Sequence, residues 1–315
     1  FENEIPLDTF YLDKNNSFLG EIPYLYEGLY NFKHGEEMQY IYLNPKDSLL
    51  IRLNTWYFDE TLVFSGVGAE RNNLLIDSFL ESEKDKKIFI KYYDLSPSDF
   101  NSKIIQAEKL KLDRYEYYVN KHPNETEKFK NIFKVALTYP LYSKIENYPL
   151  ARSAKKNYNE NLNISNYFYK HREHITLDND SLMYFYPYRN YVLNHMYNKV
   201  NSLGHDINSN EFTINLLNTI STDLSEVSSR NSMLRKTFIK HFYWNSLNTI
   251  NKNTVDTFLK CNTNSTDKKL IINLTSDVEK IKEDSFLEDF NITDYNKTQI
   301  SVNKLIKNEN SVLYF

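Results

Sequence analysis

The sequence predicts an α+β protein in which a small antiparallel β region of about 66 residues precedes a longer, mainly helical region. Five of the six glycines fall within the first 68 residues, and no proline follows Pro187. Before residue 66, short aromatic and β-branched runs alternate with turn residues, which is typical of strands. After Gly68, apolar residues recur with a period near 3.6, which is typical of amphipathic helices. The change in pattern therefore separates two kinds of structure.

The N-terminal region contains five runs that predict strands, at residues 9–12, 25–32, 38–43, 48–53 and 61–64. Asn44-Pro45-Lys46-Asp47 predicts a turn before the fourth run, because Pro fixes φ while Asn and Asp side chains bond to nearby backbone. We expect these strands to form a small antiparallel sheet or a sandwich.

Helix start and stop signals divide the middle of the chain. Ser96-Pro97 predicts a helix start, since Ser96 offers a capping oxygen and Pro97 lacks only an N–H that would be unpaired there. His122-Pro123 ends this helix, and residues 124–127 open another, which Pro140 and Pro149 should kink or divide because each removes a backbone donor. Further helices are expected near residues 166–174, 181–202, 210–227, 229–248, 252–261 and 275–283.

The last stretch changes pattern again. Residues 299–302 and 311–315 predict strands on either side of a polar turn at 307–310. We therefore expect a small β domain at residues 1–66, a helical domain at 67–284 and the beginning of a further β-containing domain at 285–315.

Length and charge limit the function classes. A chain of 315 residues is long enough for about two domains. With 42 acidic and 38 basic residues the net charge is only -4, which gives no indication of a nucleic-acid or anionic-membrane partner. No apolar run approaches the ~18 residues of a membrane-spanning helix. The first residues have neither the basic nor the apolar part of an export signal, so they neither support nor exclude secretion.

Cys261 is the single cysteine, which rules out an internal disulfide, a CxxC dithiol and any multi-cysteine metal site. It follows Phe258-Leu259-Lys260, where the pattern predicts a helix end. We expect a small buried packing residue there and not a nucleophile.

Other chemical motifs are absent or weak. Gly66-Val67-Gly68 lacks the third glycine and the Lys-Ser/Thr of phosphate-binding loops, and neither HExxH nor GxSxG occurs. Asp178-Asn179-Asp180-Ser181 loosely resembles a calcium loop but lacks its glycine and distant Glu, so a helix N-cap at Asn179 or Asp180 is the favoured interpretation.

A zinc site is the sharper hypothesis for His171-Arg172-Glu173-His174, because histidines three residues apart can share one helix face. A third ligand would have to come from His195 or His205. A solvated polar turn is the favoured alternative. The sequence thus predicts no catalytic, cofactor-binding or metal-binding residue.

Aromatic residues are abundant, with 26 Tyr and 20 Phe. An AT-rich genome would explain this together with the many Asn, Lys and Ile. A Tyr-rich surface that binds sugar or peptide is the alternative, although the tyrosines are spread along the whole chain.

Residues 40–49, with their Pro45-Lys46-Asp47-Ser48 turn, and residues 63–75, where Ser65-Gly66 leads into a helix that starts at paired asparagines, resemble Gram-negative envelope proteins of the TlpA-like thioredoxin group. The segments 181–197, 300–306 and 311–315 also resemble this family, the last two as the opening of its thioredoxin fold. The resemblance implies a β-sandwich, a helical region and the first strands of a thioredoxin fold. The family's redox cysteines would come after Phe315, so the resemblance assigns no catalytic residue here.

The resemblance implies a non-catalytic binding or structural module that docks a protein partner or positions a thioredoxin-like domain. The alternative is the substrate-selecting part of a periplasmic thiol-disulfide oxidoreductase, and a third possibility is a subunit of a larger envelope assembly. Each implies a periplasmic or outer-membrane location, with a lipid anchor upstream as an option, and a partner that is a protein and not a nucleic acid. No cofactor is expected.

Overall fold

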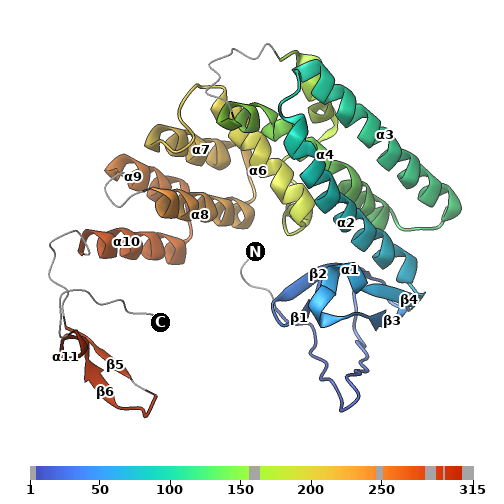
Figure 1. Ribbon diagram of the computed structural model, residues 1–315, viewed down its shortest axis with the longest axis horizontal. Helices are drawn as coiled ribbons and strands as arrows, with labels where there is room; N and C mark the ends of the chain where they lie inside the picture. The colour runs from blue at the N-terminus through green and yellow to red at the C-terminus, as the bar shows by residue number, and fades with distance from the viewer. Residues whose placement is uncertain (1–4, 156–163, 246–250, 281–288, 294, 307–315) are drawn as a thin grey trace.

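The computed structural model describes residues 5–155, 164–245, 251–280, 289–293 and 295–306. Helices dominate this part of the chain, and the strands form three small antiparallel pairs. Figure 1 shows the helices side by side in a curved array, with the N-terminal strands beneath one end of it. The predicted combination of helices and antiparallel strands is confirmed, with helix predominant.

The N-terminal strands form two sheets of two strands each. Strand β1 (Gly28–His34) pairs with β2 (Glu37–Leu43), and β3 (Ser48–Arg52) pairs with β4 (Val63–Val67). The predicted turn between β2 and β3 is confirmed, since the Asp47 amide donates to the Asn44 carbonyl at 2.9 Å. Both sheets contribute to one apolar cluster, which includes Ile41 and Phe64. A single sheet or a sandwich is not seen among the described residues.

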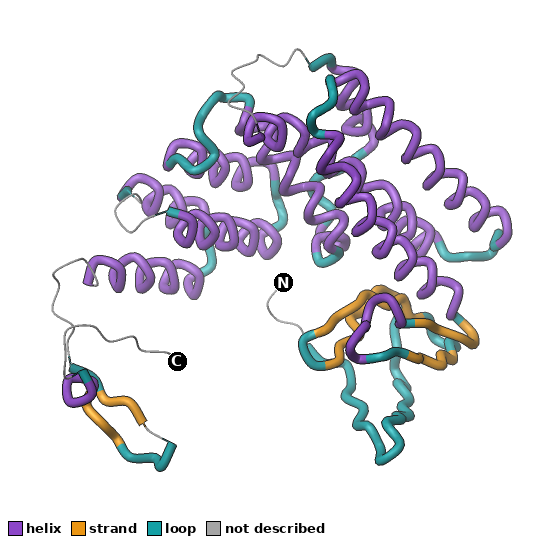
Figure 2. The backbone as a smooth tube through the Cα atoms, in the orientation of Figure 1, coloured by secondary structure: helices purple, strands orange, loops and turns teal. Residues whose placement is uncertain are grey.

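The prediction of a strand at residues 9–12 is wrong. These residues lie in an extended loop that projects beyond the sheets (Figure 2). The loop turns back at Asp13, whose carboxylate accepts from the Ser17 amide at 2.9 Å. The Phe10 ring stacks on Phe18 and lies so close to Gly20 that a side chain there would collide with it. Local aromatic packing therefore replaces strand pairing.

The helices follow the predicted order. Two short turns, η1 and α1, separate β3 from β4, and the 3₁₀ segment η2 lies between α4 and α5. The bounds are η1 Thr55–Tyr57, α1 Phe58–Thr61, α2 Ala69–Tyr92, α3 Pro97–Lys121, α4 Glu127–Lys155, η2 Asn166–His174, α5 Asp180–Met183, α6 Tyr186–Asn201, α7 Asn210–Asp223, α8 Val227–Trp244, α9 Lys252–Cys261 and α10 Ser265–Lys280.

Helix α3 begins as predicted, since Ser96 Oγ accepts from the Asp99 amide at 3.2 Å and Pro97 occupies the first turn. Helix α4 runs through Pro140 and Pro149 as one helix, so of the two predicted outcomes, a kink or a division, the division does not occur. An internal proline costs about 3 kcal/mol. The burial of Leu141 and Tyr148 in the same segment offsets this cost, because α4 packs against α2, α3 and α6.

Several predicted boundaries need correction, and the helix predicted at 210–227 ends at Asp223. Residues 181–202 form two helices, because Pro187 starts α6 as a new helix after the α5 turn. Helix α10 begins at Ser265, ten residues before the predicted start at 275. Strand β6 (Gln299–Ser301) pairs with β5 (Asn291–Thr293) but ends before Val302, where the short helix α11 (Val302–Leu305) begins. The strand predicted at 311–315 lies outside the described residues.

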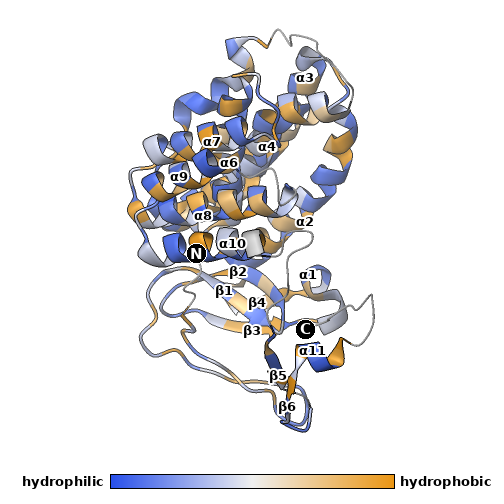
Figure 3. Ribbon diagram, turned by 90° about the vertical axis from the view of Figure 1, so that its left-hand side faces the viewer, coloured by the Kyte–Doolittle hydropathy of each residue, from blue (hydrophilic) through white to orange (hydrophobic). Residues whose placement is uncertain are grey.

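The main core lies between successive helices and extends into the first sheet. It includes Leu29 and Tyr42 from the strands together with fully buried aromatic residues such as Phe133, Tyr191 and Phe238. Figure 3 shows hydrophobic and hydrophilic residues on different sides of the same helices, as expected of amphipathic helices that pack in layers.

Candidate functional site

Two asparagines connect the N-terminal sheets to α2. Asn72 Oδ1 accepts from the Tyr42 amide at 2.7 Å, while its Nδ2 donates to the Tyr42 carbonyl at 2.9 Å. Asn73 makes the same pair of bonds with Phe64, both at 2.9 Å. Each side-chain amide thus takes the place that a further strand would occupy beside β2 or β4. The paired asparagines therefore fix α2 to both sheets.

A second contact secures the same junction. Arg71 forms an ion pair through Nη2 with Asp47 in the turn between β2 and β3. Its Nη1 lies 3.6 Å from Oε2 of Glu125, which precedes α4. Gly68, which caps α2, has φ +91°, and Asp47 packs where a side chain would be. Gly68 of the Gly66-Val67-Gly68 segment therefore allows the chain to turn into α2.

A groove of the N-terminal region lies between the sheets and the loop of residues 5–22. This groove has a volume of about 1280 Å³. Its floor is formed by side chains of β1, β2 and β3, and its opposite wall by the loop. The lining is mixed: Asp8, Lys33 and Arg52 contribute charged side chains, and the apolar members are Phe10, Leu12, Phe18, Leu29, Phe32, Ile41, Leu43, Ile51 and Leu53.

The loop wall remains partly open to solvent. Ile5, Leu7 and Leu12 are exposed although they line the groove. Isolated exposed apolar residues are ordinary, but a concave site that combines apolar side chains with a few polar groups is typical of binding sites. The groove is therefore the strongest candidate for contact with a partner.

The histidines considered as zinc ligands lie in two different environments. His171 Nε2 and His195 Nδ1 lie 3.0 and 3.1 Å from the same oxygen of Glu146, whereas His174 and His205 are exposed. The side chain of His171 is only 4% exposed, so the prediction of a solvated turn is wrong for this residue. His171 is buried because η2 packs against α4.

Glu146 is fully buried and accepts five hydrogen bonds. Arg172 donates from Nε at 2.8 Å and from Nη2 at 2.5 Å, Asn198 donates from Nδ2 at 2.7 Å, and the two histidines complete the set. Burial alone would raise the pKa of the Glu146 carboxyl, but the bonds from Arg172, His171 and His195 lower it far below its usual value. The carboxylate therefore stays ionised.

This Glu146 cluster joins three elements and leaves little room for catalysis. Its members come from α4, η2 and α6. The guanidinium of Arg172, which lies 3.9 Å from the Tyr169 ring centroid, occupies the side of the carboxylate where a cation would bind. Within the described residues, no three His, Cys, Asp or Glu side chains are grouped so that they could hold a metal ion. The arrangement suits a structural clamp.

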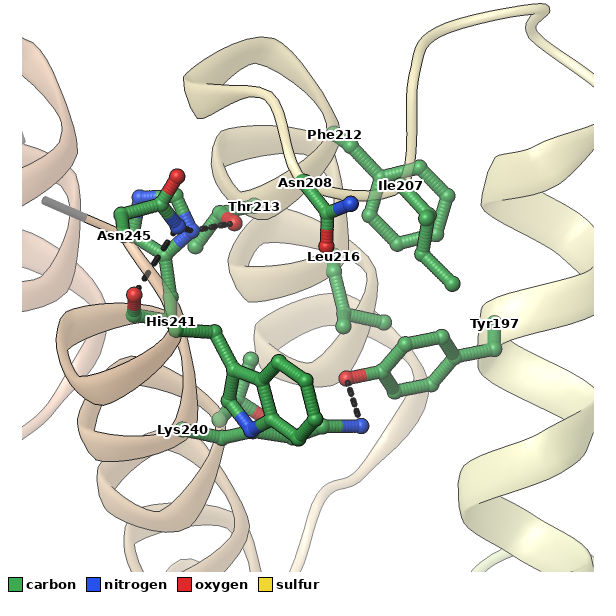
Figure 4. A pocket seen from close by; sticks show the side chains of 11 residues that line it. Tyr197, Ile207, Asn208, Phe212, Thr213, Leu216, Lys240, His241 and Asn245 are labelled. Carbon is green, nitrogen blue, oxygen red and sulfur yellow. Dashed lines mark hydrogen bonds between the residues drawn. The ribbon is translucent and has the colours of Figure 1, made fainter. Parts of the chain in front are cut away.

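A smaller pocket lies between α6, α7 and α8 (Figure 4). It encloses about 180 Å³, and Phe212 and Leu216 form part of its apolar floor. At its rim, Lys240 Nζ donates to Tyr197 Oη at 3.4 Å and lies 4.9 Å from the ring centroid. Sequence reasoning missed this pocket, because its lining comes from three helices and a loop.

His241 forms one wall of this small pocket and is held from both sides. Its Nδ1 lies 2.8 Å from Thr213 Oγ1 and 2.9 Å from Asn245 Nδ2, and its Nε2 lies 3.2 Å from Asn210 Oδ1. Burial lowers the pKa of the imidazole. The ring is therefore neutral at physiological pH and contributes shape and not charge.

Cys261 is the last residue of α9, as predicted. The thiol is half-buried against the main core, and its Sγ lies 3.7 Å from Asn218 Oδ1. Its position suits a packing role.

The acidic residues Asp178 and Asp180, at the start of α5, connect this helix to the start of α8. Asn179 is the N-cap residue of α5, as predicted, although its side chain makes no capping bond. Asp178 accepts from the Ser225 amide at 3.1 Å and from its hydroxyl, and Asp180 accepts from the Ser229 hydroxyl. Both carboxylates thus bind the start of α8, which the sequence pattern did not reveal.

Comparisons of the chain with protein-family models, curated proteins and solved structures gave no match. In the described part of the chain, no helix is both long enough and apolar enough to cross a membrane.

Proposed function

We propose that the chain is a non-catalytic binding module that docks a protein partner through the groove beside the N-terminal sheets. The supporting observation is the groove itself, to which both the strands and the exposed loop of residues 5–22 contribute apolar side chains. The occupant would be an extended apolar segment of the partner, because strands form the floor of the groove and its apolar side chains could contact alternate residues of such a segment.

On this proposal, the sequence resemblance gives the biological setting. The two N-terminal sheets would belong to a sandwich-like domain of a thioredoxin-like envelope protein, and the β5–β6 hairpin would begin its thioredoxin-like part. The partner would then be a protein of the periplasm or the outer membrane. Docking through the groove would position the thioredoxin-like part next to it.

The test is site-specific photo-crosslinking in cells that produce the whole encoded protein. A photoreactive residue at Phe32, whose side chain lines the groove, should form one defined adduct with an envelope protein. The same residue at Tyr117, which is exposed on α3, serves as the control and should not form that adduct. Ile51→Arg should abolish the Phe32 adduct by placing a charge among the apolar side chains of the floor. No Phe32 adduct, or the same products from both positions, would overturn the proposal.

The groove would equally accept an extended substrate of a thiol-disulfide oxidoreductase, which is the alternative function. Replacement of every cysteine of the encoded protein by serine separates the two. A binding module keeps its crosslinked partner in its normal redox state. Accumulation of that partner with incorrectly paired cysteines would favour the oxidoreductase.

A further inference from the structure

We propose that the pocket between α6, α7 and α8 binds a small aromatic carboxylate, with one six-membered ring enclosed and the carboxylate at Lys240. This inference is independent of the groove and of the proposed docking function. It depends on the size of the pocket, the polarity of its walls and the sign of its charge.

The size of the pocket fits a single ring. Its volume of about 180 Å³ is far larger than the ~10–15 Å³ that one water needs, and an apolar cavity of about 150 Å³ is known to hold benzene. A second fused ring or a long chain would extend into solvent. The pocket is also open at its rim, where Ile207 and Trp244 are exposed.

The walls favour an aromatic ring over a sugar. Phe212 and Leu216 line the floor, and the imidazole of His241 already has partners for both nitrogens. The Asn245 amide donates to the His241 carbonyl as well as facing the ring. A sugar would bury several hydroxyls without enough partners, and each unpaired polar group costs affinity. A flat hydrocarbon ring has no such requirement.

The charge of the pocket selects an anion. Among the described residues that line it, Lys240 carries the one charge at neutral pH, because burial keeps His241 neutral. No described carboxylate forms an ion pair with Lys240. Its ammonium instead makes a cation–π contact with the Tyr197 ring. Figure 4 shows Lys240 and Tyr197 meeting at one side of the pocket, with Asn208 beside Ile207 and Phe212. A carboxylate there would gain a charge-assisted hydrogen bond.

The two tryptophans of the chain provide a direct measurement. Trp56 is 88% exposed in η1, so Trp56→Phe leaves Trp244 as the only indole without disturbing packing. Titration of this variant with 3-phenylpropionate should change Trp244 fluorescence saturably with one site per chain. Lys240→Gln in the same background should weaken binding about fivefold, the effect of one exposed ion pair.

Matched probes and a matched variant make the result decisive. Lys260→Gln, at an exposed lysine of α9, should bind 3-phenylpropionate like the parent. The neutral analogue 3-phenylpropanol should bind more weakly to the parent and be insensitive to Lys240→Gln. The proposal is overturned if 3-phenylpropionate gives no saturable signal up to its solubility limit, if Lys240→Gln binds it unchanged, or if methyl glucoside binds more tightly.

Discussion

At the scale of single residues, Glu146 shows how a buried charge can hold a fold together. A carboxylate without partners would be strongly destabilising in the interior. Glu146 is accommodated because Arg172 neutralises its charge while His171, His195 and Asn198 complete its hydrogen bonds. The contribution of the cluster to the stability of the fold therefore depends on all of its members being present.

Glu146→Gln should lower the free energy of unfolding at pH 7 by about 2 kcal/mol, because it removes the counter-charge of the partly exposed Arg172 and one of the acceptors of the buried donors around it. The folded-state pKa of Glu146 lies below its unfolded value of about 4.5, so its stabilisation is present above that pH and decreases as the pH falls. Urea titrations should therefore show the largest difference between wild type and variant at pH 7 and a smaller one near pH 3. The exposed Glu173→Gln is the control and should have little effect. An equal loss at both pH values would contradict the ionised assignment.

At the scale of elements, the start of α2 organises the N-terminal region. Neither two-stranded sheet could be stable by itself in water. Asn72 and Asn73 pair with Tyr42 and Phe64 so that both sheets are fixed to a helix that belongs to the helical array. The sheets thus depend on the helix for their stability.

Asn72→Ala should destabilise the protein by about 3 kcal/mol, because both the amide and the carbonyl of buried Tyr42 lose their partner. Asn73→Ala should cost about 1 kcal/mol, since Asn73 and its bonds with Phe64 are only partly buried. The shift of the urea midpoint measures both. A larger effect at Asn73 than at Asn72 would show that burial does not set the strength of this junction.

At the scale of the whole molecule, the described chain has two separate concave sites. The groove and the small pocket are the two concave sites that carry a functional argument. The polar clusters at Glu146 and at Asp178 join helices instead of opening onto either site.

The 315-residue chain should not catalyse thiol-disulfide exchange. Turnover passes through a mixed disulfide that a second thiol normally resolves, and Cys261 has no partner cysteine in the sequence. Insulin reduction with dithiothreitol should proceed at the background rate with both the chain and its Cys261→Ser variant. A rate above background that disappears in the variant would identify Cys261 as a catalytic thiol.

The sequence by itself determined the features that depend on neighbours along the chain. The Ser96 cap, the Asn44–Asp47 turn, the end of α9 at Cys261 and the change from strands to helices near residue 66 all follow from residues a few positions apart. Tertiary structure decided the rest. Glu146 gained partners 25 to 52 positions away, Pro140 and Pro149 stayed inside one helix, and residues 9–12 formed a loop. In each case burial between elements set the outcome, and burial is a property of packing that no local pattern records.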